Sequence, residues 1–100
     1  MRNEDAPSIT LDTTLQRNDD IFSTDVDGEV VMMSIERGSY FGANKMGSRI
    51  WELLEQPTLV SGLCEQLMEE FDVDPDRCRT DVLAYMEHLS EHELVEIVAA

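Results

Sequence analysis

The stretch from Gly38 to Trp51 constrains the fold of this chain more than any other part of the sequence. Ser39 to Ala43 follow a turn glycine and include two adjacent aromatic residues, which is typical of a β-strand. Asn44 is a favourable helix N-cap, because its side-chain oxygen can accept a hydrogen bond from the first turn. Apolar residues then recur on one helical face, at Met46, Ile50, Leu53 and Leu54. The stretch therefore predicts a strand that runs directly into a helix.

A β-hairpin is predicted upstream of this stretch, around Asp27-Gly28. Both central residues of a type I′ turn need a positive φ, which Asp and Gly tolerate. Residues 20–26 and 29–36 flank the turn as strands, and the second of them begins with apolar residues on both faces, as in the central strand of a small sheet. Arg37-Gly38 then turns the chain into the next strand. We expect a three-stranded antiparallel meander whose third strand can lie at an edge.

Two helices are predicted between this meander and residue 71. The first begins at Asn44 and ends near Gln56, because Pro57 disfavours helical geometry in the residue before it. Thr58 is a candidate N-cap for the second helix. The apolar stripe of the second helix comprises Val60, Leu63, Cys64, Leu67 and Phe71.

A third helix is predicted from Pro75 to about Glu91, with Asp74 as its N-cap. One narrow arc of this helix should face the core, and it comprises Cys78, Val82, Tyr85 and Leu89. A second, half-polar stripe comprises Arg79, Leu83, Met86 and Ser90. The second stripe either widens the buried face or forms the wall of a binding groove. Residues 94–98 close the chain as a short strand or a packed tail, and the fold class is α+β.

The first fifteen residues show only a thin apolar pattern, so we expect residues 1–15 to be a flexible or loosely docked segment before a domain of residues 16–100. The net charge of -15 argues against nucleic-acid binding, which needs Lys and Arg to replace condensed counterions. Acidic membrane surfaces are disfavoured for the same reason. Neither a signal peptide nor a membrane span is visible, so a cytoplasmic location is expected.

Catalytic and metal-binding motifs are weak in this sequence. His88 and His92 have the i, i+4 spacing of a zinc-ligand pair, but a third ligand is not evident, and surface histidines at a helix end explain them better. Cys64 and Cys78 fit no metal or redox spacing and are predicted to be small buried hydrophobes. We therefore expect no enzyme activity, no metal and no cofactor.

The whole pattern resembles the PqqD family. The resemblance rests on Gly38–Leu54, on the Phe71-Asp72-Val73-Asp74 turn and on the Asp81-Val82-Leu83 segment, and it covers roughly residues 15–97. It implies a winged helix–turn–helix, with a three-stranded antiparallel sheet packed on three helices. This chain departs from the family pattern at Ala43, where a large aliphatic residue is common, and at His92-Glu93, where a glycine often ends the third helix.

The resemblance also implies a function. Members of this family recognise the leader of a ribosomally made precursor peptide and present it to processing enzymes, such as a lasso-peptide leader peptidase and cyclase or a radical-SAM maturase. The leader would add a strand beside Ser39, Tyr40, Phe41, Gly42 and Ala43 and lie against the third helix. We expect Leu83 and Met86 to supply apolar pockets there, and Arg79 to bind an acidic leader residue. Arg37, Lys45 and Arg49 are further candidates for that ionic contact.

Rival functions fit the sequence less well than this one. A winged helix–turn–helix could bind DNA, but the exposed side of its recognition helix would carry Asp81, Glu87 and Glu91, which repel phosphate. An acyl-carrier-like protein needs an exposed serine at a helix start, usually within Asp-Ser-Leu, and the chain lacks that tripeptide. A general protein-interaction adaptor is the remaining alternative.

Overall fold

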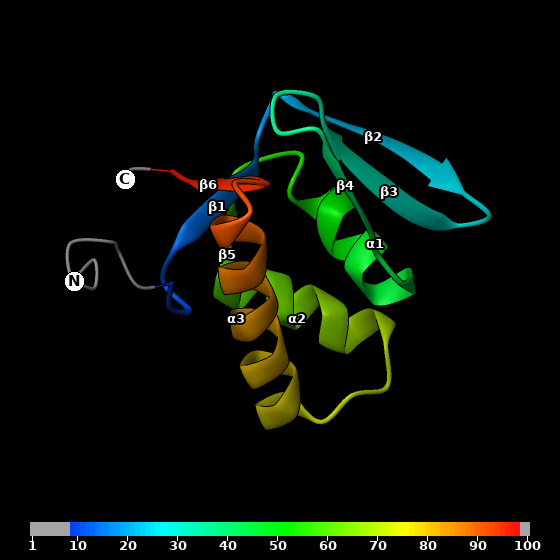
Figure 1. Ribbon diagram of the computed structural model, residues 1–100. Helices are drawn as coiled ribbons and strands as arrows, with labels where there is room; N and C mark the ends of the chain where they lie inside the picture. Colours follow the sequence, from blue (N-terminus) through cyan, green and yellow to red (C-terminus); the bar gives the residue numbers. More distant parts are fainter. Residues whose placement is uncertain (1–8, 99–100) are drawn as a thin grey trace.

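The computed structural model describes residues 9–98 and is mixed α and β (Figure 1). Three helices lie beside two small sheets, and neither sheet is covered on both of its faces by helices (Figure 1). In chain order the elements are β1 (Thr14–Arg17), β2 (Ile21–Val26), β3 (Glu29–Ser34), β4 (Ser39–Gly42), α1 (Lys45–Leu53), β5 (Thr58–Leu59), α2 (Val60–Glu70), α3 (Pro75–Glu91) and β6 (Val95–Ile97).

The predicted meander is confirmed as an antiparallel sheet in the order β2-β3-β4. Asp27 and Gly28 have φ angles of 56° and 87°, the two positive values that a type I′ turn requires. Val30, Met32 and Ser34 of β3 are buried against the helices, and the residues between them face the other side. Within this sheet β3 is central and β4 lies at one edge.

A second sheet, in the order β5-β1-β6, was not predicted. Its strands have two to four residues each and come from three distant parts of the chain, so none of them shows a clear period in the sequence. Leu15 of β1 is fully buried, and Ile9 is buried as well. Residues 1–8 of the expected N-terminal segment lie outside the described residues, so the domain division at residue 15 stays a prediction.

The helices begin where their caps predict, with one exception. The Gly47 amide donates to the Asn44 side chain over 2.8 Å, and the Arg77 amide donates to the Asp74 carboxylate over 3.0 Å. The prediction for Thr58 is wrong: this residue lies in β5, and Leu59 precedes α2 without a side-chain cap. The Thr58 hydroxyl instead donates to carbonyl oxygens of the preceding turn, because the chain pairs with β1 before α2 begins.

One core joins the helices to both sheets. Trp51 is 2% exposed and belongs to this core. Cys64 and Cys78 are both buried free thiols, as predicted, and burial raises the pKa of the Cys64 thiol to about 11. Within residues 9–98, no helix combines the length and the apolar character needed to cross a membrane.

Candidate peptide-binding site

β4 presents an open edge, because it pairs with β3 on one side and ends the sheet on the other. The Ala43 amide donates to the Val30 carbonyl over 2.9 Å, so Ala43 and Val30 form a hydrogen-bonded pair. Such pairs alternate along an antiparallel ladder, which makes Phe41 the next residue bonded to β3. The backbone N–H and C=O groups of Tyr40 and Gly42 consequently point away from β3, toward the open edge.

A buried serine fixes the end of this strand to the helix that follows it. The Ser48 hydroxyl accepts a hydrogen bond from the Val30 amide at 2.7 Å and donates to the Ala43 carbonyl at 3.2 Å. It thereby replaces a direct bond of the β3–β4 ladder and satisfies two backbone groups that would otherwise be buried without partners. The strand-to-helix stretch predicted from sequence is thus held in place by α1.

A hollow of about 310 Å³ lies between β4 and α3. The Phe41 and His92 rings lie with their centroids 4.8 Å apart, and His92 meets the edge of the His88 ring at 4.7 Å. These contacts join β4 to the C-terminal end of α3. The lining consists of Met32, Tyr40, Phe41, Gly42, Tyr85, His88, Leu89 and Leu94.

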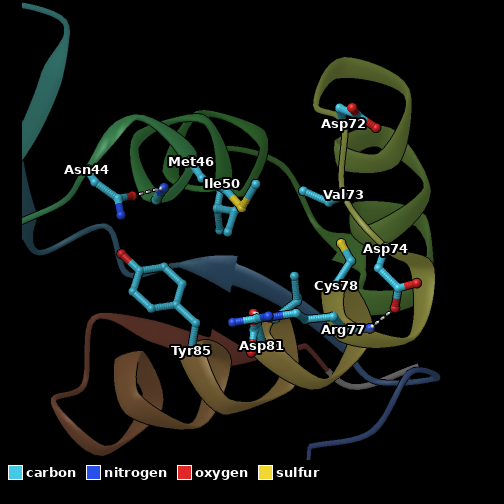
Figure 2. A pocket seen from close by; sticks show the side chains of 12 residues that line it. Asn44, Met46, Ile50, Asp72, Val73, Asp74, Arg77, Cys78, Asp81 and Tyr85 are labelled. Atoms are coloured by element: carbon cyan, nitrogen blue, oxygen red, sulfur yellow. Dashed lines mark hydrogen bonds and ion pairs between the residues drawn. The ribbon is translucent and has the colours of Figure 1, made fainter.

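A larger cavity of about 560 Å³ continues beyond Tyr85, between α1, the α2–α3 turn and α3. Figure 2 shows the Tyr85 side chain reaching from α3 toward the start of α1, while Met46 and Ile50 project into the cavity from α1. Tyr85 lines both hollows and stands between them. We refer to the two neighbouring hollows along α3 together as the groove. Burial raises the pKa of the Tyr85 hydroxyl.

Gly47 makes this close approach of Tyr85 possible. A Cβ atom added at Gly47 would lie 2.8 Å from the Tyr85 hydroxyl oxygen and 3.2 Å from the Ala43 Cβ. A larger residue at position 47 would therefore push the tyrosine away from α1. Gly47 belongs to the stretch that we singled out in the sequence, but its pairing with Tyr85 depends on how two separate helices pack.

The cavity has an apolar floor and a charged rim. Val73 and Val82 are among the apolar residues that line it. The exposed carboxylates of Asp72, Asp74 and Asp81 are spread along its edge (Figure 2). The Asp74 carboxylate caps α3, and Asp81 lies 3.7 Å from the Arg77 guanidinium. The groove can therefore accept an apolar side chain with polar or basic surroundings.

The structure places the expected α3 residues differently from the sequence analysis. Met86 is fully buried, which agrees with the alternative that the second stripe widens the buried face. Arg79 and Leu83 do not line either hollow: Leu83 packs against the core, and Arg79 pairs with Asp76 at 3.1 Å. At about 100° per residue the buried stripe of Cys78, Val82, Met86 and Leu89 is centred near Val82, which leaves Tyr85 on the flank that faces β4.

Two of the other basic candidates are engaged in ion pairs. Arg37 pairs with Glu93 at 3.3 Å. Arg49 donates two hydrogen bonds of 2.8 Å to Glu70 and a third of 3.1 Å to Glu52, which raises the pKa of its guanidinium and lowers that of the Glu70 carboxyl. The contacts of Arg49 connect α1 to α2 and stabilise the scaffold behind the groove.

The part of the chain that the structure describes contains no group of three or more metal-ligating side chains. His88 and His92 do lie next to each other, but their neighbours are aromatic rings rather than further ligands. Both histidines were predicted to be surface residues at a helix end, but His88 lines the hollow together with Tyr85. The spacing of His88 from Tyr85, about one helical turn, was the available signal.

Comparison with known proteins finds one family and two solved structures. The model of the family described as coenzyme PQQ synthesis protein D (PqqD) matches residues 29–95. The chain is 32% identical to the protein in the structure "TbiB1 in Complex with the TbiA(beta) Leader Peptide", with a TM-score of 0.77, and the match covers 85% of this chain and 99% of that one.

The second structure is "Lasso peptide synthetase B1 complexed with the leader peptide". It is 18% identical with a TM-score of 0.66, covers 82% of this chain and 96% of that one, and shows likeness of fold alone. No curated protein matches the sequence.

Proposed function

The chain belongs to the family of coenzyme PQQ synthesis protein D, and on this basis we propose that it is a non-catalytic protein that binds the leader of a ribosomally made precursor peptide. The relative that is 32% identical was solved with a leader peptide, and the match covers almost all of that chain. Binding to such a precursor also explains the expected cytoplasmic location, because ribosomal peptides are made there.

The open edge of β4 beside the α3 groove is the observation that carries this proposal. A leader in extended conformation would pair with the outward backbone groups of Tyr40 and Gly42, and main-chain hydrogen bonds would supply much of the affinity. Ser39, Phe41 and Ala43 would hold the strand in place through β3 and α1 rather than by bonding to the leader.

Side chains of the leader would enter the groove and supply specificity. Alternate residues of an added strand point to the same face, so every second leader side chain would face α3. We assign Tyr85 and His88 to the contacts that the sequence analysis gave to Leu83, Met86 and Arg79, because the first two line the groove. The rim carboxylate of Asp81 would favour a basic or polar leader residue over an acidic one.

The finer parts of the proposal concern the partners. We propose that the protein delivers its leader to the leader peptidase and cyclase of a lasso-peptide pathway, since both similar structures are complexes with leader peptides and one is described as a lasso peptide synthetase. A radical-SAM maturase is the alternative partner. The winged helix–turn–helix description and a domain of residues 16–100 belong to the same proposal.

Gly42→Pro tests the binding mode most selectively. Proline removes the backbone N–H that faces the open edge, and edge strands tolerate proline where that N–H faces solvent. Gly42→Ala is the matched control, because its Cβ would meet no atom within 4 Å and it keeps the N–H. Affinity is measured by fluorescence anisotropy with labelled leader peptides encoded by the neighbouring precursor genes.

We expect Gly42→Ala to bind the leader as the unsubstituted protein does, and Gly42→Pro to bind about tenfold or more weakly, the effect of losing about 1.4 kcal/mol. Both variants should show the circular dichroism of the folded protein. Equal affinities for two folded variants would exclude pairing at the β4 edge. Failure of every leader to bind would contradict the proposed function itself.

A further inference from the structure

The outer face of the β2-β3-β4 sheet is unusually apolar for a surface. A sheet with one face in solvent normally alternates between apolar residues inside and polar residues outside. Here the outward residues of the three strands include one charged side chain, Glu29. The others are Phe22, Thr24, Val26, Val31, Met33, Tyr40 and Gly42.

Three of these side chains form a row across the sheet. Phe22 is paired with Met33, and Met33 is paired with Tyr40, so the row crosses all three strands at one level. They are 60%, 38% and 75% exposed. Cross-strand neighbours on one face lie about 5 Å apart, so the three side chains make a continuous surface. We call it the outer row.

No element of the described chain covers the outer row. α1 packs on the opposite side of β3, and Figure 1 shows no helix on the outer side of this sheet within residues 9–98. Contiguous exposed apolar surface is rare on monomeric proteins and marks an interaction site. The buried core does not account for the composition of this face.

Charge indicates what kind of partner fits. Acidic residues surround the outer row at the hairpin turn and at the strand ends, and they are exposed. They are Asp20, Asp27, Glu29 and Glu36. A second copy of this chain would bring the same carboxylates face to face, and a net charge of -15 opposes that approach.

We infer that the outer row is a second docking surface, which binds a processing enzyme through an apolar patch flanked by lysine and arginine. The inference rests on the proposed function for the identity of the enzyme. Tyr40 belongs to both surfaces: its backbone faces the open edge of β4, and its side chain lies in the outer row. A leader strand added to β4 would extend this face by its own outward side chains, so the enzyme would contact protein and leader together.

The test measures, by isothermal titration calorimetry at low and high salt, the affinity of the full chain for the purified processing enzymes encoded beside the precursor gene. Phe22→Ser with Met33→Ser removes two of the three side chains of the outer row and leaves β4 unchanged. Ser23→Ala is the matched control, since Ser23 is exposed on the opposite face of β2. Leader affinity is measured in parallel for every variant.

We expect the double variant to lose about tenfold or more in affinity for the enzyme, as on truncating central anchors of an interface, and to keep its affinity for the leader. Gly42→Pro should lose leader binding and keep the leader-independent part of enzyme binding. The enzyme affinity of the unsubstituted protein should fall at high salt.

Three results would overturn the inference. The first is that the double variant binds the enzyme as tightly as the unsubstituted protein does. The second is that the unsubstituted protein sediments as a dimer and the double variant does not, which would make the outer row a self-interface. The third is that the protein binds the leader but binds none of the processing enzymes; the proposed leader-binding function would then stand without this second surface.

Discussion

At the scale of single residues, a few atoms decide how closely the elements of the groove approach one another. The Ser48 hydroxyl connects Val30 to Ala43, and the missing side chain of Gly47 lets Tyr85 reach α1. A third case is Glu93, which ends α3 with a φ of 59°, a conformation that usually selects glycine. The absence of glycine at this position is visible in the sequence. The positive φ of Glu93 is visible only in the structure, where the chain turns back toward β6.

The contact between Gly47 and Tyr85 predicts a coupling between the two positions. Gly47→Ala gains up to about 1 kcal/mol of helix propensity but forces the Cβ against the tyrosine oxygen, and such overpacking costs about 1–3 kcal/mol. We expect a net loss of stability in the unsubstituted protein and a smaller loss in the Tyr85→Phe background, where the nearest atom is gone but the Ala43 Cβ and the ring carbon remain within 3.4 Å. Urea unfolding of the double-mutant cycle measures this, and identical losses in both backgrounds would contradict it.

At the scale of elements, the orientation of α3 separates the sequence analysis from the structure. The period of the helix was correct, but the buried stripe is shifted so that it includes Met86 and leaves Tyr85 at its edge. Periodicity alone could not settle this, because both arcs contain apolar residues and the choice depends on where α2 and the sheets pack. The strand order, the hairpin turn and two helix caps were predictable, because local chemistry fixes them.

This shift gives a prediction for α3 that separates core from surface. Met86→Ala should lower the free energy of unfolding by about 2–5 kcal/mol, as expected for a fully buried side chain. Leu83→Ala should cost clearly less, since Leu83 is only half-buried. Chemical denaturation of both variants checks this, and equal costs would mean that the two side chains are equally buried.

At the scale of the whole molecule, one edge strand adjoins two surfaces of different chemistry. The inner side of β4 opens into a groove lined by Tyr85 and His88, and its outer side carries Tyr40 within an exposed apolar row. Apolar residues on both faces of β3 were already evident in the sequence, where they were explained by the central position of that strand in the sheet. In the small second sheet, β6 lies within residues 94–98, which were predicted as a short strand or a packed tail. The sheet itself was not predicted, because its other two strands are too short to show a period.

The central claim is that a leader peptide adds to the open edge of β4, and amide hydrogen exchange of the isotope-labelled protein tests it most directly. In the free protein the Tyr40 and Gly42 amides face solvent and should exchange quickly, whereas the Phe41 amide is already bonded to β3. A saturating leader peptide should slow exchange at Tyr40 and Gly42 and change Phe41 little. Unchanged exchange at Tyr40 and Gly42 in the saturated complex would contradict the account.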